Sequence, residues 1–138
     1  MEQRSENMSR TLKATLLVIA LIVTIVVAYV ALTYPRTVVS FPVSFTLGAD
    51  VEERDFDMPI LHRWVQIEVA FTSGTALWTA KIESVSATVW SDSAHQASQT
   101  TYKSGLVELP SGSYNFTFAT AGGSLEAEIT VTSKGGFW

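Results

Sequence analysis

The sequence has no cysteine among its 138 residues, which excludes disulfides, thiolate metal ligands and cysteine nucleophiles. It has only two histidines, His62 and His95, which fall in separate segments, whereas a catalytic zinc site usually takes three protein ligands. Neither a glycine-rich phosphate loop nor a Gly-x-Ser-x-Gly nucleophile elbow is present. We therefore expect no cofactor and a protein that is not an enzyme.

Positive charge is scarce in the carboxy-terminal part of the chain. From Thr37 onward there are five Lys or Arg residues against eleven Asp or Glu residues, which argues against a nucleic-acid partner. Three basic residues precede the apolar segment, at positions 4, 10 and 13, and Arg36 alone follows it closely. The positive-inside rule then predicts a cytoplasmic amino-terminal tail (residues 1–13) and an extracytoplasmic carboxy-terminal domain.

One long hydrophobic run stands out between residues 14 and 34. It carries no charge, and twelve of its 21 residues are Leu, Ile or Val. A helix of this length spans about 31 Å, close to the thickness of a bilayer's hydrocarbon core. The run predicts a single transmembrane helix over residues 14–34. A cleaved signal peptide is the alternative, with Val26-Val27-Ala28 as a cleavage site, but the length of the run favours a retained anchor.

Small residues recur on one side of this predicted helix, at Ala20, Thr24, Ala28 and Ala31. Small side chains let two helix backbones approach closely in lipid, so the stripe predicts a helix–helix interface. The alternative is that small residues are merely tolerated there. The partners we expect are therefore the lipid bilayer and either other membrane-protein subunits or a second copy of this chain.

Residues 37–133 show the period-two alternation of β-strands and no amphipathic helix. The pattern predicts about seven short strands, at residues 37–47, 64–72, 76–83, 85–90, 102–109, 114–118 and 125–132. Pro42 inside the first of them indicates an edge strand. Tight turns are expected at residues 73–75 and 121–124. In the strand at 85–90, we expect Val85, Ala87 and Val89 to point inward. Residues 48–59 and 91–101 are expected to be loops.

The stretch from Leu109 to Phe116 reads Leu-Pro-Ser-Gly-Ser-Tyr-Asn-Phe. It resembles the Leu-Pro-x-Gly-x-Tyr stretch of fibronectin type III-like and carboxypeptidase-regulatory-like β-sandwich domains. The resemblance implies that Tyr114 opens a core strand as a tyrosine corner and that the domain is an accessory or interaction module. The expected fold is therefore an all-β sandwich (Ig/fibronectin-like, about seven strands) over residues 37–133, preceded by one transmembrane α-helix.

Two short motifs in the predicted domain suggest ligands or modification. Asp50, Glu53, Asp55 and Asp57 could supply oxygen ligands to calcium, but the glycine and closing glutamate of a calcium loop are missing. A solvated acidic loop is the favoured interpretation. Asn115-Phe116-Thr117 is a glycosylation sequon, and the alternation predicts that the Asn115 side chain faces solvent.

The chain ends in an aromatic tail, residues 134–138, with Phe137 and Trp138 at its end. The tail either folds back onto the domain or contacts a neighbouring subunit or the membrane interface. The leading hypothesis is a membrane-anchored, non-catalytic accessory or interaction subunit of a larger membrane or cell-envelope assembly. The alternative is a filament subunit resembling archaeal pilins, with the hydrophobic helix in the filament core, since Lys13-Ala14 resembles a prepilin cleavage site.

Overall fold

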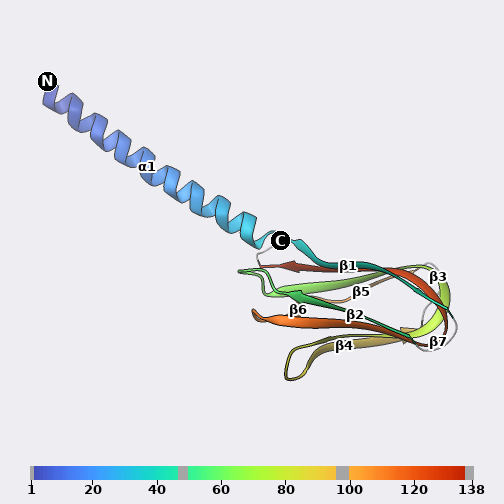
Figure 1. The fold of residues 1–138 in the computed structure, drawn as a ribbon. Helices are drawn as coiled ribbons and strands as arrows, with labels where there is room; N and C mark the ends of the chain where they lie inside the picture. Colours follow the sequence, from blue (N-terminus) through green and yellow to red (C-terminus); the bar gives the residue numbers. More distant parts are fainter. Residues whose placement is uncertain (1, 47–49, 96–99, 136–138) are drawn as a thin grey trace. The chain divides into compact units, whose positions relative to one another are not determined.

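The computed structural model describes residues 2–46, 50–95 and 100–135, and is mostly β after one long apolar helix (Figure 1). The chain forms two compact units, Met1–Leu32 and Thr33–Trp138. The described elements are α1 (Glu2–Thr33), β1 (Arg36–Phe45), β2 (Asp50–Asp57), β3 (Trp64–Glu83), β4 (Thr88–His95), β5 (Thr101–Lys103), β6 (Val107–Glu108) and β7 (Ser113–Lys134).

The first unit contains all of α1 except its last residue, Thr33, and the segment Ser9–Thr33 is long and apolar enough to cross a membrane. By length and composition it fits a membrane anchor or a signal sequence. The helix stops at Thr33 because Pro35 cannot continue the hydrogen-bond ladder and disfavours helical geometry at Tyr34. None of the span's most apolar window is buried within the protein, so its aliphatic surface is left for another apolar environment.

The second unit is built on one antiparallel sheet in the order β1-β7-β3-β4, with β2 also paired to β7 and β5 and β6 paired to β3. Because β1 lies at the end of this order, the edge position predicted from Pro42 is confirmed. The two longest strands, β3 and β7, form the centre and pair along almost their whole length, from Trp64↔Lys134 to Glu83↔Asn115.

Both central strands bend sharply at one place, where Gly74 has φ 92° and Gly123 has φ 82°. The β3–β7 register shifts on either side of Gly74, as expected for β-bulges. A Cβ atom at Gly74 would lie 2.2 Å from the Ser124 carbonyl oxygen, so only glycine allows this backbone approach. The tight turns predicted at residues 73–75 and 121–124 are therefore wrong as strand ends: both stretches are bends within continuous strands.

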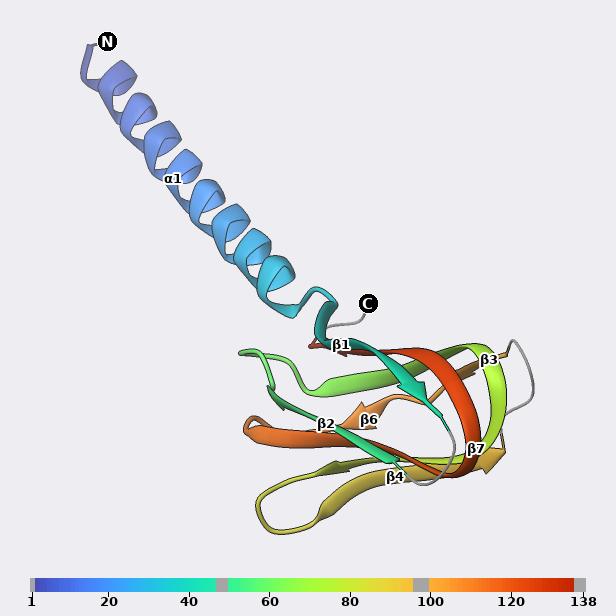
Figure 2. The same ribbon diagram turned by 45° about the vertical axis from the view of Figure 1, so that its right-hand side comes forward.

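These bends fold the sheet into two facing layers (Figure 2). The first half of β3 and the second half of β7 join β1, β5 and β6 in one layer, and the remaining halves join β2 and β4 in the other. The bulges also shift the inward positions of β3 from odd to even residue numbers, so both halves of the strand point into the core. The predicted two-layered all-β architecture is thus present, but as one folded-over sheet rather than separate short strands.

Aromatic side chains fill the space between the layers. Trp78 is almost fully buried and contacts Phe71, Phe118 and Tyr102, with ring centroids 4.8–5.8 Å apart. Phe41 meets Phe116 edge to face across the layers at 6.1 Å. Such pairs add about 0.5–1.5 kcal/mol each beyond the area they bury.

Two sequence predictions fail near the edges of the sheet. Val85 and Ala87 lie in an exposed turn closed by a 2.8 Å bond from the Ser84 amide to the Ala87 carbonyl. Val89, in β4, is also exposed, so the predicted inward face of residues 85–90 is wrong. The acidic segment predicted as a loop contains strand β2, which pairs with β7 along its length. Charged side chains on an edge strand discourage pairing with other chains, which reconciles its composition with strand geometry.

Candidate functional site

Tyr114 forms the tyrosine corner that the sequence predicts. Its side chain is only 6% exposed, and its hydroxyl donates a 2.6 Å hydrogen bond to the Pro110 carbonyl, four residues upstream. Its ring stacks on Phe56 of β2 at 5.6 Å. Burial raises the pKa of the Tyr114 hydroxyl. This residue therefore fixes the turn between β6 and β7, and its role is structural.

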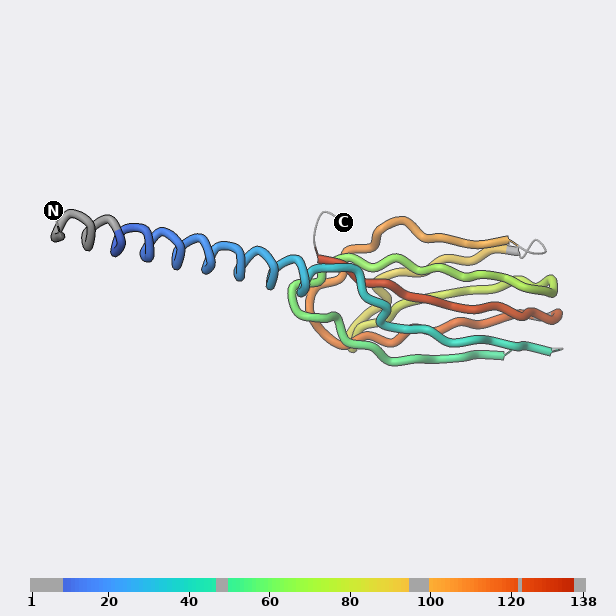
Figure 3. Tube along the Cα trace, turned by 90° about the horizontal axis from the view of Figure 1, so that it is seen from above, coloured from blue at the N-terminus to red at the C-terminus, as the bar shows by residue number. Residues whose placement is uncertain are grey.

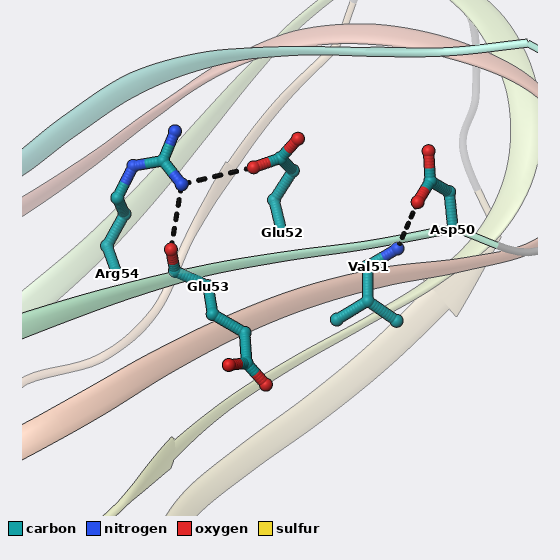
Figure 4. A network of polar contacts seen from close by, with 5 residues as sticks. All are labelled: Asp50, Val51, Glu52, Glu53 and Arg54. Carbon is teal, nitrogen blue, oxygen red and sulfur yellow. Dashed lines mark hydrogen bonds and ion pairs between the residues drawn. The ribbon is translucent and has the colours of Figure 1, made fainter.

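The carboxylates proposed for calcium are spread along β2. Figure 4 shows Asp50 accepting a 2.8 Å hydrogen bond from the Val51 amide, and Arg54 bridging the Glu52 carboxylate and the Glu53 carbonyl. The Arg54 guanidinium also lies 4.5 Å from the centre of the Phe41 ring in β1. The alternation of β2 thus turns Arg54 toward β1, whereas Glu53, Asp55 and Asp57 share the exposed face.

Asp55 and Asp57 line a shallow depression together with Glu83, Ser113 and Asn115. Asp55 accepts a 2.8 Å bond from the Asn115 amide, Asp57 accepts one from the Ser113 hydroxyl, and Glu83 pairs with Lys81 at 2.6 Å. The carboxylates are therefore engaged with neighbouring side chains. Within residues 2–46, 50–95 and 100–135, no group of three or more His, Cys, Asp or Glu side chains is placed to hold a metal ion.

The two histidines are not brought together. His62 is buried, and its Nδ1 lies 2.7 Å from the Ser133 hydroxyl. His95 ends β4, where its backbone pairs with Leu77 next to the bend of β3. Leu77 lies near the middle of β3, whereas His62 precedes the start of that strand, so the backbone of His95 is not placed beside His62.

The sequon residue Asn115 is half-buried and lines the depression on the outer face of the sheet. Its amide nitrogen, the atom that a glycan would modify, donates to Asp55, and its side-chain oxygen accepts a 2.9 Å bond from the Thr117 hydroxyl. Thr117 is itself buried. A glycan at Asn115 would require this hydrogen-bonded arrangement to open.

The predicted helix-interface residues Ala20, Thr24, Ala28 and Ala31 are all exposed on α1. The Thr24 hydroxyl donates a 2.7 Å bond to the Ala20 carbonyl one turn earlier, so it is satisfied within its own helix. The stripe therefore presents small, apolar surface without requiring a polar partner.

Two exposed aliphatic residues escaped the sequence interpretation, because they lie in a loop without periodicity. Ile60 and Leu61 are 68% and 53% exposed, and Leu61 has a left-handed backbone with φ 64°. In the sequence, only the adjacent Pro59 indicates a turn here. The turn is closed by a 3.0 Å hydrogen bond from the His62 amide to the Pro59 carbonyl. Phe137 and Trp138 lie outside the described residues.

Comparison with known proteins finds similarity in structure but not in sequence. No protein-family model and no curated protein matches the sequence. The chain is similar in structure to a carbohydrate-binding module of Cellvibrio mixtus lichenase 5A, solved with cellotriose (18% identity, TM-score 0.46, covering 72% of this chain and 86% of that one). It is also similar to the carbohydrate-binding module CBM36, solved with calcium and xylotriose (12% identity, TM-score 0.42, 72% and 92% covered), and to PirA (13%, 0.41, 68% and 92%).

Tyr102 gives the domain a predicted sensitivity to alkaline pH. The pKa of Tyr102 lies far above its usual value. Desolvation of the Tyr102 hydroxyl is the larger cause, and its hydrogen bond to Asp92 is the next. The folded state therefore favours the neutral phenol of Tyr102, which stabilises the domain below pH ~10. As the pH rises further, Tyr102 ionises in the unfolded chain but not in the folded one, so this stabilisation is lost. Thermal melts of the full chain in detergent should show that Tyr102→Phe loses less stability between pH 9 and 11 than the unsubstituted chain. An equal loss would contradict the assignment.

Proposed function

We propose that this chain is a membrane-anchored, non-catalytic accessory or interaction subunit of a larger membrane or cell-envelope assembly. Its amino terminus lies in the cytoplasm and its β domain outside. The observation that carries the proposal is α1, whose apolar surface is exposed along residues 9–32 and presents a stripe of small residues on one side. A helix of this kind suits both a bilayer and close packing against another helix.

The surface of the β domain supports an interaction role over a catalytic one. Three carboxylates on β2, those of Glu52, Asp55 and Asp57, are engaged by guanidinium, amide and hydroxyl groups, and among the described residues no histidine lines the acidic depression beside them. The charge asymmetry across the apolar segment, with Arg4, Arg10 and Lys13 before residue 14, supports the orientation.

Enlarging the small-residue stripe tests the proposal. The double substitution Ala20→Leu and Ala28→Leu should keep the chain in the membrane, because leucine suits the bilayer at least as well as alanine. It should nevertheless release the chain from its assembly, because close backbone approach is then blocked. The measurement is gentle detergent extraction of native membranes, with co-purifying proteins identified by mass spectrometry.

A matched control enlarges the opposite side of the same helix, with Ile22→Phe and Val26→Phe. Successive residues are offset by about 100° around an α-helix, so these positions face away from the stripe. The control should retain the co-purifying proteins. If both double variants retain them, α1 is an anchor alone and the interaction role of the stripe is refuted.

A pilin-like filament subunit is the second candidate. Two features favour it: the helix runs into the β domain with only Tyr34 and Pro35 between α1 and β1, and Lys13-Ala14 resembles a prepilin cleavage site. Mass spectrometry of the purified chain separates the two candidates, because the filament candidate requires a mature amino terminus at Ala14.

A further inference from the structure

We propose that the loop Pro59–Arg63 is a membrane-contact loop, which places the exposed Ile60 and Leu61 side chains in the lipid headgroup region. This inference rests on the proposed function, in that α1 must remain as a membrane anchor. It adds a lipid-binding surface on the β domain itself, separate from the apolar helix.

The loop is tied to the residue where the apolar helix ends. The Gly135 amide donates a 3.0 Å hydrogen bond to the carbonyl of Thr33, the last residue of α1. Gly135 also packs directly on the loop, since a Cβ atom there would lie 1.9 Å from the Leu61 carbonyl oxygen. Thr33, Gly135 and Leu61 belong to the same compact unit, so their proximity is independent of how the helix leaves the domain.

The depth of Thr33 in a bilayer follows from the length of the apolar segment. The uncharged part of α1 begins at Ala14, and twenty helical residues span about 30 Å, the thickness of the hydrocarbon core. Thr33 therefore lies at the outer edge of the hydrocarbon when α1 spans the membrane. The groups packed beside it lie at headgroup level, where the exposed Tyr34 ring is also favourable.

The backbone of Leu61 supports a role for its side chain outside the domain. A left-handed conformation is unfavourable for a residue with a Cβ, and glycine or asparagine usually occupies such positions. The Leu61 side chain does not offset this by burial, because it is 53% exposed. An exposed aliphatic residue in a conformation that suits glycine is explained if lipid covers it.

The one charged side chain of the loop itself is paired, which indicates an apolar rather than an electrostatic contact by the loop. Arg63, at the end of the loop, pairs with Glu108 at 2.5 Å, and its guanidinium lies 5.5 Å from the centre of the Trp64 ring. The paired charges favour neither anionic nor cationic lipid. The contact should therefore form on zwitterionic phosphatidylcholine and persist at high salt.

The cysteine-free chain allows a direct measurement. The full chain carrying Ile60→Cys, labelled with an environment-sensitive fluorophore, is reconstituted into phosphatidylcholine vesicles that contain nitroxide lipids. The matched control is Ser124→Cys, an exposed position paired with Thr75 in the bend of β3 and β7. Figure 3 shows this bend at the end of the domain opposite the start of β1. Lipid nitroxide should quench the label at residue 60 about threefold more than the label at residue 124, as expected for insertion into the headgroup boundary.

Adding Leu61→Gly to the labelled chain should reduce quenching at residue 60 without lowering the melting temperature, because glycine suits the left-handed backbone.

Three outcomes would contradict the proposal. In vesicles that carry the protein, the membrane contact is refuted if an aqueous quencher reaches the labels at residues 60 and 124 equally. A label at residue 60 that is shielded from both quenchers would overturn it in favour of a cover by the chain's own Phe137–Trp138 tail or by another subunit. Failure of the chain to float with the vesicles would instead refute the anchor, and with it both proposals.

Discussion

Replacing Gly74 by alanine should destabilise the β domain by about 3–5 kcal/mol, combining the cost of a left-handed backbone with that of a steric overlap. The added Cβ would lie 2.2 Å from the Ser124 carbonyl oxygen and 2.7 Å from the Leu125 Cα, and both are backbone atoms of the paired strand. Neither can move without breaking the β3–β7 ladder. Because whole domains are stable by only about 5–15 kcal/mol, one methyl group would remove much of that margin.

The measurement is urea unfolding of the full chain in mild detergent, followed by tryptophan fluorescence, to which the buried Trp78 contributes. Gly105→Ala is the matched control, since a Cβ there meets no atom within 4 Å. That change should be neutral or stabilise by up to about 1 kcal/mol, because alanine restricts the unfolded chain. If Gly74→Ala unfolds at the same urea concentration as Gly105→Ala, the continuous bent strand is wrong.

Truncating Tyr114 to alanine should cost about 3–5 kcal/mol, the range for a large buried aromatic residue. The substitution removes the stack on Phe56 and the hydrogen bond to Pro110, and leaves a cavity next to the fully buried Phe116. Tyr114→Phe keeps the ring and removes only the hydroxyl. It should cost about 1 kcal/mol, the net value of one hydrogen bond.

The ratio of these two losses separates packing from hydrogen bonding at the corner. The same urea unfolding measures both. A loss below about 0.5 kcal/mol for Tyr114→Ala is typical of a surface residue and would contradict its burial. Equal losses for the two variants would show that the hydroxyl, and not the ring, holds the turn.

The sequence predicts the strands that have a buried face and a repeating period. Residues of β1 and both halves of β3 and β7 alternate, and their inward positions are buried as expected. What the sequence does not reveal is the continuity of β3 and β7, because a glycine between two alternating runs is compatible with a hairpin turn or with a bulge. Only the pairing of Gly74 with Leu125 in the neighbouring strand decides between them.

The edges of the sheet were harder to predict, because little of their surface is buried. In β2 only Phe56 is fully buried, so the charged residues around it indicated a loop. The tyrosine corner was predicted because its turn has a local signature, Leu-Pro-Ser-Gly-Ser-Tyr. The membrane-contact loop has none: the left-handed backbone of Leu61 and its packing against Gly135 depend on residues more than seventy positions apart in the chain.

The bond between the Gly135 amide and the Thr33 carbonyl also decides how the domain responds to force. The chain enters the domain and leaves it at the same end, where Arg36 of β1 pairs with Ser133 of β7. A pull that separates Thr33 from Gly135 would load this ladder at its end and break its hydrogen bonds one at a time, instead of shearing them together. The β1–β7 ladder therefore resists force applied at this end less than force applied along its two strands in opposite directions.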